Sequence, residues 1–156
     1  MNASRPSWDH YFMEICRVVA QRSTCTRAAV GAVVVRDRTI LATGYNGSPA
    51  GLPHCTDVGC LIYASTDPLG EREENCFRTI HAEINAIAQA AKHGVGIGGS
   101  SIYITHSPCI HCLKVIVNTG IRRVCYVRPY KPHRIAELVS ASGISLIQVP
   151  MEEPAV

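Results

Sequence analysis

The segment TIHAEINAIAQ, Thr79 to Gln89, combines a helical apolar pattern with two polar residues that the pattern does not explain. The apolar residues recur at intervals of three and four, as on one face of a helix: Ile80, Ile84, Ile87, Ala88 and Ala91. We expect this helix to run from about Ile80 to His93, before Gly94. His81 and Glu83, at its start, suit neither a packed core nor a solvated face, so their partner must lie elsewhere in the chain.

That partner is the segment HSPCIHC, residues 106–112. Cys109 and Cys112 are separated by two residues, follow Pro108, and stand between an expected strand and an expected helix. Two cysteines at a helix start bring their sulfurs together, and the helix dipole favours the thiolate form that zinc requires. Together with His81 they give three zinc ligands and leave a fourth position open, which is typical of a catalytic site.

A C-x-x-C pair also occurs in thioredoxin-like redox proteins and in closed structural zinc sites. A redox pair does not need a His-x-Glu upstream, and a closed zinc site needs four ligands. Glu83 is expected beside the metal rather than on it, where it can take a proton from water and deliver it to a substrate nitrogen. The combination H-x-E…P-C-x-x-C is the signature of zinc-dependent nucleobase deaminases.

The composition limits the class of protein. A chain of 156 residues, 47% of them hydrophobic, is expected to form a single domain over residues 1–156. No apolar run approaches about 18 residues, so we expect no membrane span. The first ten residues lack a signal-peptide pattern, so we expect a cytoplasmic protein. The net charge of +3, the scattered basic residues and an aromatic content of 6% argue against nucleic-acid binding.

Helices and strands alternate after an initial hairpin, which predicts an α/β fold: a three-layer sandwich whose mixed sheet has parallel strands at one side. The expected strands are residues 30–35, 39–45, 101–105, 121–127 and 144–150. The expected helices are residues 8–19, 80–93, 109–120 and 133–141. Residues 46–78 are rich in Gly and Pro at their start and are expected to form a long loop, with at most a short helix.

Four longer segments resemble the deoxycytidylate (dCMP) deaminases of the cytidine deaminase superfamily, over about residues 8–150. These are VGAVVV (30–35), TGYNGSPAGLPHC (43–55), CFRTIHAEINAI (76–87) and YITHSPCIHCLKVIVNTGI (103–121). The resemblance implies the α/β/α fold of the cytidine deaminase type with a five-stranded sheet. It also implies hydrolysis of dCMP to dUMP and ammonia, with zinc on His81, Cys109 and Cys112 and proton transfer by Glu83.

The same resemblance implies contacts with the substrate. Asn46 is expected to contact the sugar, the Ala82 backbone N–H the base carbonyl, and the segment around Ser107 the exocyclic amine. Arg27 and Tyr130 match positions near the nucleotide phosphate. A phosphate monoester needs a cationic or N–H-rich clamp, and an arginine can bind it through two parallel hydrogen bonds. The sequence does not choose among six basic residues for this role: Arg27, Arg72, Arg78, Lys114, Arg128 and Lys131.

Four further cysteines lie outside the catalytic set: Cys25, Cys55, Cys60 and Cys76. In relatives this part of the chain often holds a second, structural zinc ion, and such a site would fasten the long loop. We expect these four cysteines to be its ligands, with His54 as a substitute. The alternative is that they are ordinary reduced cysteines.

The resemblance further implies a homo-oligomer, a hexamer in several relatives, that is activated by dCTP and inhibited by dTTP. At two positions where some regulated relatives carry an aromatic residue and an arginine, this chain has Gln89 and Lys92.

Three other functions remain to be weighed. A deaminase for tRNA adenosine, guanine or a riboflavin precursor is disfavoured by GYNGSPAG, and a nucleic-acid cytosine deaminase by the few aromatic residues. A non-catalytic binding module held by zinc would give Glu83 no role.

Overall fold

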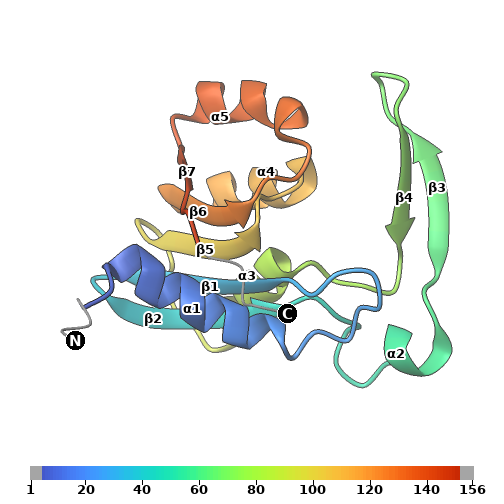
Figure 1. Ribbon diagram of the computed structural model, residues 1–156, viewed down its shortest axis with the longest axis horizontal. Helices are drawn as coiled ribbons and strands as arrows, with labels where there is room; N and C mark the ends of the chain where they lie inside the picture. The colour runs from blue at the N-terminus through green and yellow to red at the C-terminus, as the bar shows by residue number, and fades with distance from the viewer. Residues whose placement is uncertain (1–4, 152–156) are drawn as a thin grey trace.

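A five-stranded mixed sheet organises the computed structural model, which describes residues 5–151. Its strand order is β2-β1-β5-β6-β7 (Figure 1). The strands are β1 (Gly31–Arg36), β2 (Thr39–Tyr45), β5 (Ser101–His106), β6 (Arg123–Arg128) and β7 (Ser145–Gln148). β1 pairs antiparallel with β2 and β5, whereas β5, β6 and β7 are parallel, so the predicted mixed sheet is confirmed.

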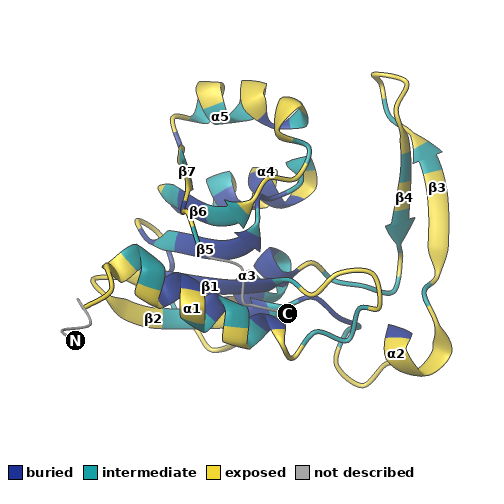
Figure 2. Ribbon diagram, viewed as in Figure 1, coloured by how far each residue is buried: buried dark blue, intermediate teal, exposed yellow. Residues whose placement is uncertain are grey.

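Helices cover both faces of this sheet. The long helices are α1 (Trp8–Ala20), α3 (Ala82–Lys92), α4 (Ile110–Asn118) and α5 (Ala136–Ser142), with a 3-10 turn η1 (Pro132–Arg134) before α5. One hydrophobic cluster joins α1 to one face, and a second joins α3, α4 and α5 to the other. Figure 2 shows the buried residues concentrated in β1, β5 and the helix faces turned toward them. The predicted three-layer α/β/α arrangement is thereby confirmed.

The strand β1 reads as a continuous apolar run because it is buried on both sides. Ala32 and Val34 belong to the cluster with α3 and α4. Val33 and Val35 alternate with them and belong to the cluster with α1. A central strand with helices on both faces loses the usual polar alternation. No helix among residues 5–151 is long and apolar enough to cross a membrane.

The buried face of α3 differs from the predicted one. The residues of α3 that are buried are Ala82, Glu83, Ala86 and Ala90, and the isoleucine stripe is only partly covered. The cause is a close approach to β2: a Cβ atom on Gly44 would lie 2.3 Å from the backbone nitrogen of Ala86. Only alanine fits against a strand at that separation, so the larger Ile84 lies at the side of the helix.

The predicted long loop is more ordered than expected. It contains a short helix α2 (Cys55–Val58) and a hairpin of β3 (Ile62–Thr66) and β4 (Arg72–Cys76), which forms a separate two-stranded sheet. Figure 1 shows this hairpin standing beside the main sheet rather than joining it. The Asp67 carboxylate closes its turn by accepting hydrogen bonds from the backbone N–H groups of Leu69 and Glu71, at 2.9 and 2.8 Å.

Candidate active site

Two helix starts bring the predicted metal ligands together. His81 is the N-cap residue of α3 and Cys109 is the N-cap residue of α4. Neither side chain caps its own helix, so both are free to face a shared centre. The Nδ1 atom of His81 lies 3.6 Å from the sulfur of Cys109 and 3.3 Å from that of Cys112.

These separations suit one zinc ion. A nitrogen and a sulfur bound to the same tetrahedral zinc lie about 3.6 Å apart, given bond lengths near 2.1 and 2.3 Å. The three ligand atoms of His81, Cys109 and Cys112 all lie within 4.8 Å of one another. One imidazole and two thiolates form a donor set that zinc favours, and they leave a coordination position for water or substrate.

The electrostatics of the group favour metal binding. Hydrogen bonds with Cys112, and then with His81, hold the pKa of the Cys109 thiol well below its usual range. The hydrogen bond to Cys109 is the main cause that raises the pKa of His81. The group therefore favours the thiolate form of Cys109, which is the form that binds a divalent cation.

Glu83 lies in the first turn of α3 with only 4% of its surface exposed. Burial is the main reason that its pKa is raised, to about 7. A carboxyl group with a pKa near neutrality can both accept and donate a proton, which a proton carrier requires. The nearby positive charge of His81 acts in the opposite direction, and a bound cation would reinforce that effect.

A cavity of about 280 Å³ connects this group to the predicted substrate contacts. Its lining includes the catalytic candidates His81, Glu83 and Cys109. It also includes all four predicted side-chain contacts with the substrate, which are Arg27, Asn46, Ser107 and Tyr130. Ala82, whose predicted contact is through its backbone N–H, is fully buried at the start of α3. The structure thus gathers residues that are far apart in the sequence around one hollow.

Asn46 also builds the wall of the cavity. Its side-chain oxygen accepts hydrogen bonds from the backbone N–H of Val30 at 2.8 Å and from the hydroxyl of Ser23 at 2.6 Å. Its side-chain nitrogen donates to the carbonyl of Ala28 at 2.8 Å. The loop that carries Arg27 is therefore fixed by Asn46, and one amide N–H remains for a ligand.

Ser107 and Tyr130 are tied to each other. The Ser107 hydroxyl accepts a hydrogen bond from the Tyr130 backbone N–H at 2.6 Å and lies 3.2 Å from the Tyr130 carbonyl, to which it donates. Arg27 donates from Nη1 to the carbonyl oxygen of Glu74 at 3.0 Å. Arg27 and Tyr130, the residues predicted to lie near the phosphate, are thus each hydrogen-bonded to a neighbouring segment of the cavity wall.

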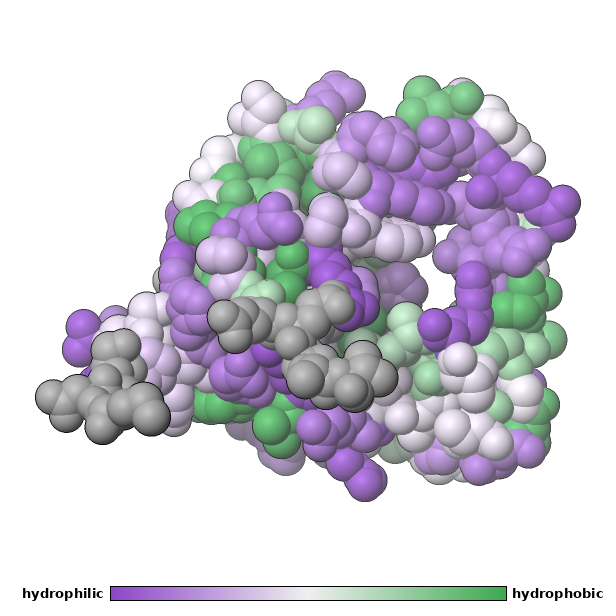
Figure 3. Space-filling view, in the orientation of Figure 1, coloured by the Kyte–Doolittle hydropathy of each residue, from purple (hydrophilic) through white to green (hydrophobic). Residues whose placement is uncertain are grey.

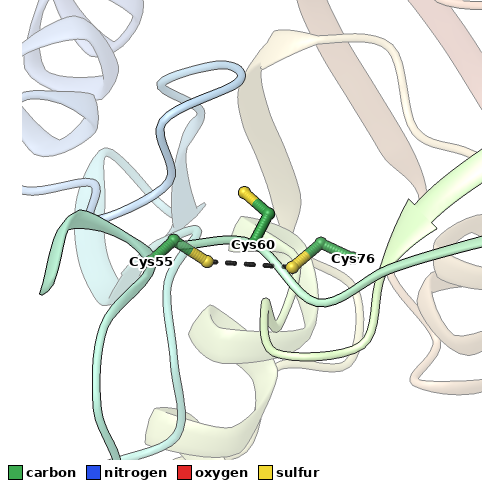
Figure 4. A group of neighbouring side chains, drawn as sticks. All are labelled: Cys55, Cys60 and Cys76. Carbon is green, nitrogen blue, oxygen red and sulfur yellow. Dashed lines mark hydrogen bonds between the residues drawn. The ribbon is translucent and has the colours of Figure 1, made fainter. Parts of the chain in front are cut away.

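A second cysteine group lies at the base of the hairpin. The sulfurs of Cys55, Cys60 and Cys76 lie within 4.8 Å of one another (Figure 4). Those of Cys55 and Cys76 are 3.7 Å apart, close to the roughly 3.8 Å expected for two thiolates on one tetrahedral zinc. Figure 4 shows the three side chains meeting from α2, the following loop and the end of β4.

Cys25, the fourth predicted ligand, does not belong to this group, which within residues 5–151 consists of Cys55, Cys60 and Cys76. Cys25 lines the active-site cavity instead, while its neighbour Thr26 lies 3.3 Å from the Cys60 sulfur. The substitute His54 precedes Cys55, and its buried Nδ1 atom has no hydrogen-bond partner within residues 5–151. Both residues stay candidates for a fourth ligand.

The sequence analysis did not find Glu74 and Asn75, which line the cavity from β4. Their strand was hidden in the expected loop because its residues, REENC, have low strand propensity. A signal was present in DPLG, residues 67–70, which is a turn pattern between two runs of equal length. The hairpin could have been predicted from it.

Comparison with known proteins agrees with this geometry. A family model described as the cytidine and deoxycytidylate deaminase zinc-binding region matches residues 6–128. The chain belongs to this family. The matched range contains both halves of the zinc motif, with Glu83 in the first half, and ends at the last residue of β6.

Relatives of this family member cover most of its length. ComE operon protein 2 of Bacillus subtilis is 47% identical over 96% of this chain and 75% of its own. The deoxycytidylate deaminase of Schizosaccharomyces pombe is 39% identical over 97% of this chain, which spans only 47% of that protein. The crystal structure of dCMP deaminase from the cyanophage S-TIM5 in complex with dCMP and dUMP is 30% identical, with a TM-score of 0.75, and covers 93% of this chain and 98% of its own.

Proposed function

We propose that the chain is a zinc-dependent deaminase, a single domain over residues 1–156, that converts dCMP and water to dUMP and ammonia. The observation that carries the proposal is the cavity in which the buried Glu83 stands beside the His81, Cys109 and Cys112 group. A redox pair or a closed structural site would not need a buried carboxyl group with a raised pKa at this position.

Zinc bound to His81, Cys109 and Cys112 would supply a Lewis acid that makes water nucleophilic near neutral pH. Glu83 then carries out the proton transfers. Its carboxylate takes one proton from the attacking water and gives it to N3 of the base as the new C4–O bond forms. It then takes the remaining proton from the C4 hydroxyl and gives it to the 4-amino group, which leaves as ammonia while C4 becomes a carbonyl. The burial of Glu83 keeps the carried proton away from bulk solvent.

The remaining lining residues orient the nucleotide. Asn46 offers its free amide N–H to the sugar, and the Ala82 backbone N–H would meet the base carbonyl. The Ser107 segment would face the exocyclic amine, while Arg27 and Tyr130 would hold the phosphate. The exposed position of Arg27 at the rim suits a doubly charged phosphate that keeps part of its hydration.

Ammonia release from dCMP, cytidine and dCTP, measured in parallel on the zinc-loaded protein, tests the function. We expect turnover of dCMP and at least about 100-fold lower kcat/KM for cytidine, because the phosphate contacts are then lost. Equal turnover of cytidine and dCMP would contradict the assigned phosphate contacts. An absence of turnover with all three compounds, with or without dCTP as an activator, would contradict the proposed activity.

We also propose a structural zinc on Cys55, Cys60 and Cys76, with Cys25 or His54 as the fourth ligand. The wild-type protein should then contain about two zinc ions per chain, and Cys76→Ser about one. Because the lost ion fastens the base of the hairpin, protease cleavage within residues 62–76 should become faster in Cys76→Ser.

Elemental analysis of Cys25→Ser and His54→Ala serves as the matched comparison, since the variant that loses one zinc identifies the fourth ligand. A zinc content that is unchanged in Cys76→Ser would contradict the proposed structural zinc site.

Homohexameric assembly, activation by dCTP, inhibition by dTTP and a cytoplasmic location stay predictions from the family resemblance. Light scattering and initial rates with each nucleotide would test the assembly and the regulation.

A further inference from the structure

The β3–β4 hairpin is fastened to the rest of the protein at both of its ends. Its base carries Cys60 and Cys76 of the second cysteine group. Its turn meets the segment between β6 and α5 through charged side chains. Figure 3 shows a gap between the hairpin and the body of the molecule, with strongly hydrophilic residues gathered where the upper part of the hairpin meets the body.

Arg134 is the centre of the contact at the turn. Its Nη2 atom lies 2.9 Å from the Asp67 carboxylate and 2.6 Å from that of Glu71. Its Nη1 atom pairs with Glu73, which also accepts a hydrogen bond from Lys131 at 3.0 Å. We call these five residues, Asp67, Glu71, Glu73, Lys131 and Arg134, the hairpin clamp.

The Arg134–Asp67 pair of the clamp is shielded from solvent to an unusual degree for a surface ion pair, whereas Glu71 at its edge is exposed. The side chains of Arg134 and Asp67 are only 10% and 13% exposed. The Arg72–Glu74 pair on the same hairpin is 73% and 51% exposed, and pairs of that kind contribute little. Removal of Arg134 would leave three carboxylates close together without their shared cation, so the clamp should open.

The segment that supplies the cations is also held in a rarely populated conformation. Lys131 has a φ angle of 41°, in the left-handed region that residues with a Cβ seldom adopt. Such a conformation persists when surrounding contacts determine it. The Arg134 guanidinium also holds the pKa of Glu71 below its usual range, in agreement with a formed ion pair.

The clamp lies next to the cavity on two sides. Glu74 and Asn75, which follow Glu73 in β4, line the cavity, and Arg27 donates to the Glu74 carbonyl. On the other side, Tyr130 precedes Lys131 and lines the same cavity. The clamp therefore joins β4 to the segment that follows β6, and both segments contribute residues to the lining of the Glu83 cavity.

From this arrangement we propose that Arg134 is a positioning residue for the substrate: by closing the hairpin clamp it holds β4 in place as one wall of the nucleotide site. The proposal rests on the proposed deaminase function. Glu73, Lys131 and Arg134 of the clamp line a second cavity, of about 360 Å³, together with the zinc-ligand candidates. Within residues 5–151 no hydrogen bond or ion pair joins the clamp to Glu83 or to those ligands, so its loss should weaken substrate binding more than it slows the chemical step.

Steady-state kinetics with dCMP test this role in Arg134→Ala, with Arg72→Ala as the matched control on the same hairpin. We expect the KM of Arg134→Ala to rise about 10-fold while kcat changes by less than about 2-fold. Both constants should stay within about 2-fold of wild type in Arg72→Ala, because that pair is solvated. Arg134→Lys keeps one charge without the planar fork and should recover part of the lost affinity.

Hydrogen exchange of residues 62–76 supplies a readout that does not depend on activity. We expect faster exchange there in Arg134→Ala, with unchanged exchange in α3, and a smaller effect in Glu71→Gln, which removes one exposed carboxylate of the clamp. If Arg134→Ala does not fold, Glu71→Gln and Arg134→Lys decide the question by the same two measurements.

If the hydrogen-exchange rates of residues 62–76 in these variants equal those of the wild-type protein, the claim that the clamp holds the hairpin is wrong. Faster exchange with an unchanged KM would overturn the positioning role. A wild-type protein without deaminase activity would contradict the proposed function instead, and the exchange data would still decide whether the clamp exists.

Discussion

Replacement of Glu83 by glutamine is expected to lower kcat for dCMP by about 10³-fold, because a positioned acid–base group contributes about 10² to 10⁴. The glutamine side chain would have nearly the same shape but could not carry a proton. Glu83 is not among the three grouped ligands, so zinc content should match that of the wild-type protein. The measurement is single-substrate kinetics of ammonia release together with elemental analysis of the same preparation.

Glu14→Gln provides the control, since Glu14 is an exposed carboxylate in α1 whose only described role is an ion pair with Arg17. It should leave kcat and KM unchanged. Retention of more than about a tenth of the wild-type kcat in Glu83→Gln would show that another group moves the protons. Such a result would favour a binding module or a different catalytic assignment, even with the zinc ion present.

The grouping of the proposed catalytic residues could be predicted from the sequence because their spacing is local. His81 and Glu83 both lie at the start of one helix, with one residue between them. Cys109 and Cys112 lie at the start of another helix, with two residues between them. Metal coordination tolerates only a few residue types, so the pattern is specific. The structure added the N-cap positions of His81 and Cys109, which explain why neither side chain caps its helix.

The turn pattern DPLG could have indicated the hairpin, but neither the strand β4 nor the hairpin clamp could be predicted from periodicity or from local spacing. Arg134 meets Asp67 and Glu71 across more than 60 positions, and the spacing of single charged residues does not reveal such a contact. The strand β4 is polar on both faces: Arg72 and Glu74 are exposed, and Glu73 and Asn75 are partly buried and line cavities. Periodicity identifies strands through a buried apolar face, which this strand lacks.

The error in the face of α3 has a related cause. Helical periodicity gives weight to large apolar residues, whereas the sheet-facing side of α3 is made of alanines. Their small size is required by Gly44 on β2, which is far away in the sequence. The signal was the glycine inside a strand pattern, which often marks the close approach of another backbone.

That close approach leads to the second large prediction, for Gly44→Ala. The new Cβ would lie 2.3 Å from the Ala86 nitrogen and 2.4 Å from the Ala82 carbonyl oxygen, and backbone atoms cannot rotate away. The start of α3 must then move from β2, to which Asn85 now ties it by a hydrogen bond to the Tyr45 carbonyl at 2.9 Å. We expect a loss of about 3 kcal/mol in the free energy of unfolding, measured by urea denaturation.

The same displacement should reach the catalytic group, because His81 and Glu83 flank Ala82 at the end of α3 that would be pushed outward. A misplacement of about 1 Å costs about 100-fold in rate, so the folded fraction of Gly44→Ala should show a kcat about 100-fold below wild type. Gly96→Ala is the control, since a Cβ there would meet nothing within 4 Å, and its stability should change by less than about 1 kcal/mol. If Gly44→Ala has the stability and the kcat of the wild-type protein, then the close packing of α3 against β2 is not needed to position Glu83.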